Sequence, residues 1–195
     1  MSQRILYTIG HSTRSWREFT HLLLIWKIAE LIDVRTVPRS RAFPKFNKDR
    51  MAAALRRMGI TYTHFKELGG LRHSRKGSTN TGWRNASFRG YADYMQSQEF
   101  LQALAELNRH RRRHRVCIMC SEALWWRCHR RMIADAEAAR GIPVRHIMSD
   151  RTARPHEITS FARIRRLQNR CVYVDYPGGS LAQSNVCGRD MSQMN

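Results

Sequence analysis

The chain has no long apolar segment. None of its 195 residues belongs to an uninterrupted apolar run of about 18, the length that a transmembrane helix needs. The N-terminal segment has one arginine and a brief apolar stretch that ends at Gly10 and His11, which is not the pattern of a secretory signal. There is also no internal repeat. These absences predict a cytoplasmic protein without a membrane partner.

Cysteine is infrequent, and the number of cysteines is odd. The five are Cys117, Cys120, Cys128, Cys171 and Cys187. Disulfide frameworks are typical of short secreted chains with an even number of cysteines. We therefore expect reduced thiols.

Acidic residues are few, at 15 Asp and Glu against 35 Lys and Arg, so the net charge is +20. Most of the positive charge is arginine, which binds phosphate through paired N–H donors. The charge predicts a polyanionic partner, either nucleic acid or another phosphorylated ligand. The alternative is a basic surface without a dedicated partner. The sequence does not indicate an oligomeric state.

Short apolar segments alternate with segments of helical periodicity. We expect strands at 5–9, 30–34, 60–65, 116–120 and 144–147. We expect helices at 16–26, 47–58, from 98 onward, at 127–140 and within 151–168, with a helical turn at 91–95. This order predicts an α/β fold: one three-layer, Rossmann-like domain over residues 1–170, with a mostly parallel sheet and helices on both faces. Residues 171–195 lack periodicity, and we expect a disordered tail there.

Polar residues follow four of the expected strands, at the ends that a parallel sheet brings to one edge. They are His11 and Ser12; Asp33 and Arg35; Glu67, Gly69 and Gly70; and Cys120, Glu122, Cys128, His129 and Arg130. We expect these groups to converge on one site.

Cys120 is the candidate nucleophile, because a thiol near a helix N-terminus and cationic side chains has a lowered pKa. The alternative is a buried cysteine that fills the end of a strand. Glu122 is a candidate general acid or base; alternatively it only stabilises the N-terminus of the next helix.

Three further residues are candidates for catalysis. Asp33 ends an apolar strand, and either takes part in catalysis or forms a structural ion pair with Arg35. His11 and His129 are candidate proton carriers; alternatively each imidazole only bonds a loop backbone.

A metal site is a further alternative, in which zinc binds Cys120, Cys128, His129 and His11. The C-x7-C-H spacing matches none of the common structural zinc patterns, so we predict no metal and no other cofactor.

Substrate binding is expected from basic and aromatic residues of two loops, 35–46 and 71–90, together with the strand ends. Arginines would hold phosphate, aromatic rings would stack on exposed bases, and glycines would allow close backbone approach. The alternative is that the aromatic residues only fix the long loop to the domain. The candidates are Ser12, Arg35, Arg39, Arg41, Gly69, Gly70, Trp83, Arg84, Arg127, Cys128 and Arg130.

Five ordered motifs resemble the bacterial family called domain of unknown function 488. They are TIGHSTRS (8–15), LIDVRTVPRSR (31–41), ELGGLR (67–72), NTGWRNASFRGYADYM (80–95) and the C-x-E…W-R-C-H-R segment (120–130). The resemblance implies a bacterial cytosolic α/β domain with polar residues at the strand ends. It does not imply a reaction.

A weaker likeness is to rhodaneses and cysteine phosphatases, in the order of strand, Cys, Arg-containing loop, helix and Gly over residues 116–141. Those families have a tight Gly-rich loop, whereas this chain has the bulky segment 123–126. We expect an enzyme that acts on nucleic acid or a nucleotide. The alternatives are a rhodanese- or phosphatase-like thiol enzyme for a small anion, or a non-catalytic nucleic-acid-binding module.

Overall fold

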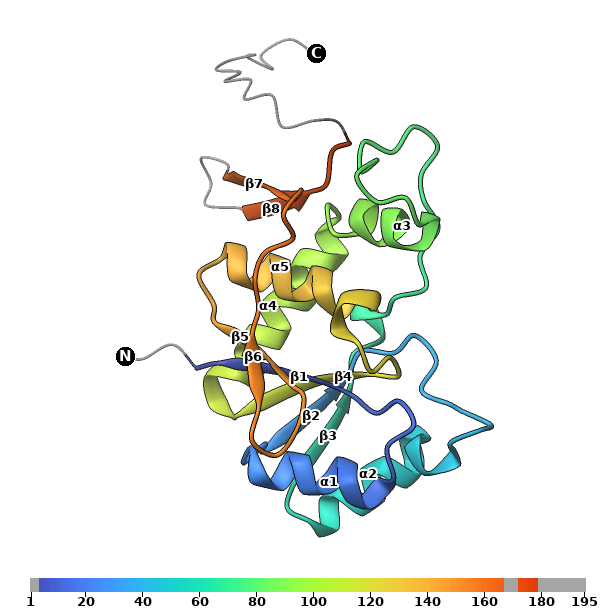
Figure 1. The fold of residues 1–195 in the computed structure, drawn as a ribbon, viewed down its shortest axis with the longest axis vertical. Coiled ribbons are helices and arrows are strands. Elements are labelled where there is room, and N and C mark those ends of the chain that lie inside the picture. The colour runs from blue at the N-terminus through green and yellow to red at the C-terminus, as the bar shows by residue number, and fades with distance from the viewer. Residues whose placement is uncertain (1–3, 167–171, 179–195) are drawn as a thin grey trace.

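The computed structural model describes residues 4–166 and 172–178 (Figure 1). Within these residues the strands are β1 (Leu6–Gly10), β2 (Glu30–Asp33), β3 (Thr61–His64), β4 (Val116–Cys120), β5 (Val144–Ile147), β6 (Ala153–Pro155), β7 (Arg163–Arg166) and β8 (Val172–Asp175). The α-helices are α1 (Trp16–Ile25), α2 (Lys48–Arg57), α3 (Ala86–Tyr94), α4 (Gln98–Arg113) and α5 (Arg130–Ala139). Short 3-10 turns cover Pro44–Phe46, Lys66–Leu68 and Trp125–Arg127.

The main sheet has the strand order β3-β2-β4-β1-β5-β6. Its first five strands are parallel, and β6 runs antiparallel to β5. Figure 1 shows α1 and α2 on one side of this sheet and α4 and α5 on the other. Side chains of β4 alternate between the two apolar cores that these helices cover, with Cys117 and Met119 in one and Ile118 and Cys120 in the other. The mostly parallel, three-layer α/β fold is therefore confirmed.

Helix boundaries follow from local signals. Ser15 accepts a hydrogen bond from the Glu18 amide, and the Glu18 side chain accepts one from the Ser15 amide, so a complete capping box starts α1. Helix α2 is followed by Gly59, whose φ of +72° suits glycine. Helix α3 is longer than the expected turn at 91–95, because Asn85 caps the backbone of Ser87 and Phe88.

The helix expected within 151–168 is wrong. Residues 153–155 pair with β5, and residues 163–166 pair with β8 in a separate two-stranded sheet. Pro155 ends the edge strand, where its missing N–H is tolerated. The buried Asp135 carboxylate accepts bonds from His156, Thr159 and Tyr176, which fixes this segment against α5 in an extended form.

Strand β8 and the fully buried Tyr176 lie beyond the predicted end of the domain at residue 170. The folded part of the chain thus extends further than the sequence indicated. Residues 179–195 of the predicted tail lie outside the described residues. In the described part of the chain, no helix combines the length and apolarity required to cross a bilayer.

Candidate functional site

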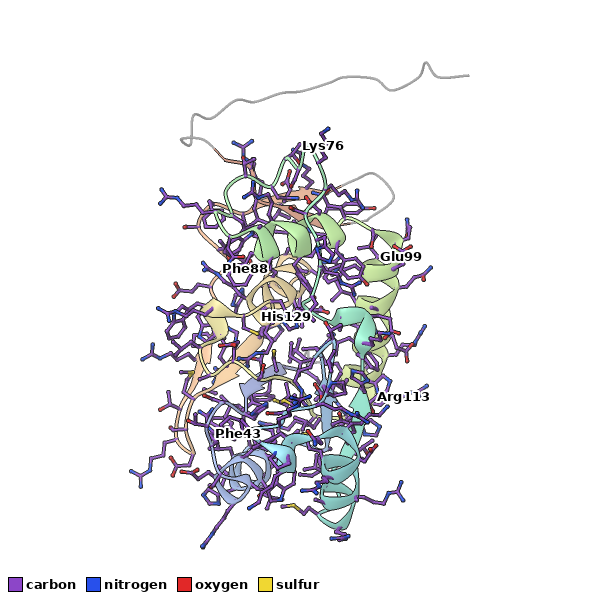
Figure 2. All side chains as sticks on the ribbon, turned by 90° about the vertical axis from the view of Figure 1, so that its right-hand side faces the viewer. Phe43, Lys76, Phe88, Glu99, Arg113 and His129 are labelled. Carbon is purple, nitrogen blue, oxygen red and sulfur yellow. The ribbon has the colours of Figure 1, made fainter. Side chains whose placement is uncertain are left out.

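A cavity of about 610 Å³ opens at the carboxyl edge of the parallel strands. Its walls come from the segments that follow β1, β2 and β4, and from Gly70, Leu71 and the start of α3. Figure 2 shows His129 at a height between Phe88 and Phe43, and all three residues line this cavity. The cavity lies where an open α/β sheet usually binds its ligand.

Ten of the predicted site residues line the cavity: His11, Ser12, Arg35, Arg39, Gly70, Cys120, Glu122, Arg127, Cys128 and His129. Six others do not: Asp33, Arg41, Gly69, Trp83, Arg84 and Arg130. The convergence of four separate chain segments follows from the parallel pairing of β1, β2, β3 and β4.

Asp33 is fully buried behind the cavity. Its carboxylate accepts bonds from the Arg35 backbone and guanidinium, at 2.6 Å for the shortest, and from the Tyr62 hydroxyl at 2.7 Å. Arg35 also donates to the Phe46 carbonyl. The arrangement is the structural Asp–Arg pair that the sequence left open, and it anchors the loop that forms one cavity wall.

His11 has partners on both ring nitrogens. Its Nδ1 lies 3.0 Å from the Ser12 carbonyl, so Nδ1–H donates there and Nε2 faces the Arg35 guanidinium at 3.5 Å. The ring stacks on Phe46 at 4.2 Å. Burial, with the nearby Arg35 charge, lowers the pKa of His11 to about 4, although the Ser12 bond opposes this. His11 is therefore a neutral, positioned imidazole at pH 7, unlike the neutral-pH proton carrier that the sequence suggested.

Cys120, Cys128 and His129 form the floor of the cavity. His129 Nδ1 lies 3.6 Å from the Cys128 sulfur and 3.9 Å from the Cys120 sulfur. His129 Nε2 lies 3.0 Å from the Val34 carbonyl. All three side chains are buried, but each contributes to the cavity lining.

The two thiols differ in acidity. The hydrogen bond to Cys128, followed by burial, raises the pKa of Cys120 to about 12. Burial also opposes ionisation of Cys128, but the bond from Cys120 and the charge and N–H groups of Arg130 lower its pKa to about 6. The lowered pKa thus belongs to Cys128, whereas the sequence assigned it to Cys120.

Arg130 is 1% exposed and does not reach the cavity. Its guanidinium contacts the Cys128 sulfur at 3.4 Å, the Thr8 hydroxyl at 3.4 Å and the Glu122 carbonyl. Within the described residues no carboxylate forms an ion pair with Arg130. A buried cation needs a partner, and the Cys128 sulfur, whose pKa Arg130 helps to lower, is the ionisable group that Arg130 contacts.

The long loop before α3 is fixed to the domain. Asp93 accepts bonds from the Arg75 amide, the Ser78 hydroxyl and the Asn80 side chain. Trp83 is 7% exposed and packs edge-on against Phe88 and Phe161. This ring therefore holds the loop in place and presents no face to a base.

Exposed arginines and apolar side chains surround the mouth of the cavity. Arg39 and Arg127 are exposed, and their guanidiniums have no hydrogen-bond or ion-pair partner within the described residues. Sequence reasoning missed Val37, Phe43 and Leu71, which supply an apolar wall. Their signal in the sequence is weak: single apolar residues in otherwise polar loops.

A second cavity of about 610 Å³ adjoins the first, with Thr36, Val37 and Arg39 lining both. Its other cations are Lys48, Arg50 and Lys66, against the single acid Asp49. None of these three cations was singled out from the sequence, because they come from separate segments that only the fold brings together.

Comparison with known proteins identifies a family. The search of curated proteins and the search of solved structures each found no match. A family model described as "Domain of unknown function DUF488" matches residues 15–136. The match covers more than half of the chain and includes the loop from Cys120 to His129. The chain therefore belongs to the DUF488 family.

Proposed function

We propose that this protein is an enzyme that binds nucleic acid or a nucleotide at the cavity and acts on it with polar groups that line the cavity. One observation carries the proposal. A cavity of ligand size has the sulfur and imidazole groups of Cys120, Cys128 and His129 at its floor and the exposed Glu122 carboxylate in its lining. Two arginines whose guanidiniums have no partner within the described residues, Arg39 and Arg127, also line it.

The electrostatics favour an anionic ligand. The chain has a net charge of +20, and the arginines at the mouth are free to pair with phosphate oxygens. The apolar side chains of Val37, Phe43 and Leu71 offer a surface for the flat face of a base beside them.

The second cavity favours a polynucleotide over a mononucleotide. Arg39 lines both cavities, and Lys48, Arg50 and Lys66 add three more cations to the lining of the second. Successive phosphates of one strand would match two adjoining cationic cavities, whereas a small anion would need only one of them.

Glu122 is the candidate general acid or base. It is exposed, lines the cavity and directly follows Cys120 and Ser121, which also line it. Cys120, Cys128 and His129 lie at the base of the same space and would contact the reacting group. Asp33 and His11 would act through the loops that they position. A cytoplasmic location would keep the thiols reduced.

The rhodanese- or phosphatase-like alternative is less well supported. In the loop after β4, the Arg127 and Cys128 amides donate to the Leu124 and Trp125 carbonyls. These amides are therefore unavailable for a backbone cradle around an oxyanion. Arg130, the arginine beside the thiol, faces the protein interior.

Removal of the arginines at the mouth is expected to weaken nucleic-acid binding. We expect the Arg39→Ala/Arg127→Ala variant to bind a single-stranded oligonucleotide about 10-fold more weakly and to show a shallower salt dependence, by roughly 0.7 per lost phosphate contact in the log–log slope. Fluorescence anisotropy across a salt series measures both quantities.

The matched control is Arg57→Ala/Arg112→Ala, which removes the same charge from exposed positions near the C-terminal ends of α2 and α4. It should keep nearly wild-type affinity. Equal losses in the two double variants would mean that binding is a property of the overall charge, and the proposed site would be wrong. Tighter binding of inorganic phosphate than of the oligonucleotide would favour the small-anion alternative.

Catalysis is tested with Glu122→Gln, which keeps the size of the side chain and removes its acid–base function. DNA, RNA and nucleotide pools incubated with the wild type should give a product, detected by mass spectrometry, that falls by about 100-fold or more with the variant. Oligonucleotide binding should persist. If the wild type gives no product that depends on Glu122, the non-catalytic binding module is the better description.

A further inference from the structure

We propose that Cys120, Cys128 and His129 bind a zinc ion, with the fourth coordination position open to the cavity. Among residues 4–166 and 172–178, these three form the only group of three His, Cys, Asp or Glu side chains whose ligand atoms all lie within 4.8 Å of one another. The proposal goes beyond the proposed function and does not depend on which ligand the cavity takes.

The spacing of the donor atoms fits tetrahedral coordination. Zinc–sulfur bonds of about 2.3 Å and zinc–nitrogen bonds of about 2.0–2.1 Å place a sulfur and a nitrogen about 3.6 Å apart on a tetrahedron. His129 Nδ1 lies 3.6 Å from one sulfur and 3.9 Å from the other. A shift of a few tenths of an ångström in the Cys120 side chain would therefore complete the geometry.

The hydrogen bond of His129 presents the correct nitrogen. The Val34 carbonyl can only accept, so Nε2 carries the proton and the lone pair of the neutral ring is on Nδ1, facing the sulfurs. Metal-binding histidines commonly donate their second N–H to a carbonyl in this way. Gly70 leaves room beside the ring, since a Cβ there would lie 2.5 Å from Nδ1.

The surrounding charges suit a zinc dithiolate. The ion and two thiolates together are neutral, and Arg130 donates to the Cys128 sulfur at 3.4 Å, which stabilises the coordinated thiolate. Two thiolates with one imidazole favour zinc over calcium or magnesium, which take oxygen ligands. Because all three groups line the cavity, the remaining position would face a ligand, as in catalytic rather than structural zinc sites.

The test is zinc binding by the purified full chain under reducing conditions, after removal of metal with a chelator. We expect one zinc per chain, measured in competition with a chromophoric chelator. Cobalt in place of zinc should give thiolate charge-transfer bands and the d–d bands of a tetrahedral site. Cys120→Ser, Cys128→Ser and His129→Ala should each weaken zinc binding by about 100-fold or more, since loss of even a supporting contact costs 10–100-fold.

Cys117→Ala is the matched control. Cys117 lies on the same strand as Cys120, but its side chain belongs to the core on the other face of the sheet. This variant, and the Cys171→Ser/Cys187→Ser variant, should bind zinc as the wild type does. The Arg39→Ala/Arg127→Ala variant should also keep full zinc affinity while losing oligonucleotide affinity. The zinc proposal and the nucleic-acid proposal are therefore tested independently.

Several outcomes would overturn the zinc site. They are wild-type affinity in Cys128→Ser, loss of zinc in the Cys171→Ser/Cys187→Ser variant, or a wild-type cobalt spectrum without thiolate bands. Circular dichroism checks that each variant is folded. If the ligand variants do not fold, two measurements on the wild type test the zinc site. They are the cobalt spectrum and the protection of Cys120 and Cys128 from iodoacetamide by added zinc.

Discussion

Gly10→Ala is expected to destabilise the protein by about 3 kcal/mol or more and to disrupt the site. A Cβ at Gly10 would lie 1.8 Å from the Glu122 carbonyl oxygen and 2.7 Å from its carbon. Real Cβ atoms essentially never approach other atoms within 3.0 Å. Because the obstacle is backbone, the loop after β4 has to move, and with it the carbonyl that accepts the Arg130 bond. Urea unfolding measures the change in free energy.

Gly59→Ala is the control for this prediction. Gly59 has a φ of +72° but no atom within 4 Å of its would-be Cβ, so alanine there incurs only backbone strain of about 1–2 kcal/mol. Gly10→Ala should cost more and should also weaken zinc and oligonucleotide binding, whereas Gly59→Ala should leave both unchanged. A smaller loss of stability for Gly10→Ala than for Gly59→Ala would show that the loop yields easily.

The parallel sheet could be predicted because its signals are local. Each strand of β1, β2, β3, β4 and β5 is a short apolar or alternating segment close to its expected range, and the helix caps at Ser15 and Ser97 are visible as residues. The prediction of a helix within 151–168 was wrong because the conformation of this segment is set by distant contacts. Its conformation depends on a bond network around Asp135, whose partners are 20 or more residues away.

The location of the site could be predicted from the sequence, but the roles of its individual residues could not all be predicted. Parallel pairing brings the residues after each strand to one edge, so His11, Cys120 and His129 were found without knowledge of the structure. Which residues face the cavity depends on side-chain pairing. Asp33 is occupied by Arg35 and Tyr62, and Arg130 points inward to Thr8 and Cys128.

The sequence also did not show which of the two cysteines has the lowered pKa. Both Cys120 and Cys128 are near the start of α5, so position alone does not separate them. The difference comes from the hydrogen bond between the two sulfurs, which raises the pKa of Cys120 and lowers that of Cys128. It also comes from Arg130, two residues after Cys128, whose side chain folds back onto that sulfur. A guanidinium that folds inward has no signature in one sequence, since most arginines are solvent-exposed.

A buried glutamate outside the site makes stability depend on pH. Glu137 on α5 is fully buried and accepts two bonds from the Asn108 side chain. Burial raises the pKa of Glu137 to about 7, although the Asn108 bonds and the nearby Arg140 and Arg111 charges oppose the shift. Since the ordinary pKa is 4.5, the folded state binds this proton more tightly than the unfolded chain does.

Glu137→Gln is therefore expected to stabilise the protein at pH 8 and to have little effect at pH 4. The Glu137 contribution to stability is fully present below pH 4.5, falls as the pH rises toward about 7 and stays low above that value. The shift corresponds to a loss on the order of 3 kcal/mol, and glutamine avoids it because its neutral amide still accepts from Asn108. Urea unfolding of both proteins from pH 4 to pH 8 measures the difference. Glu157→Gln, at an exposed position, should change nothing. A Glu137→Gln protein that is no more stable than wild type at pH 8 would mean that the Glu137 carboxylate is well compensated by Arg111 and Arg140 when ionised.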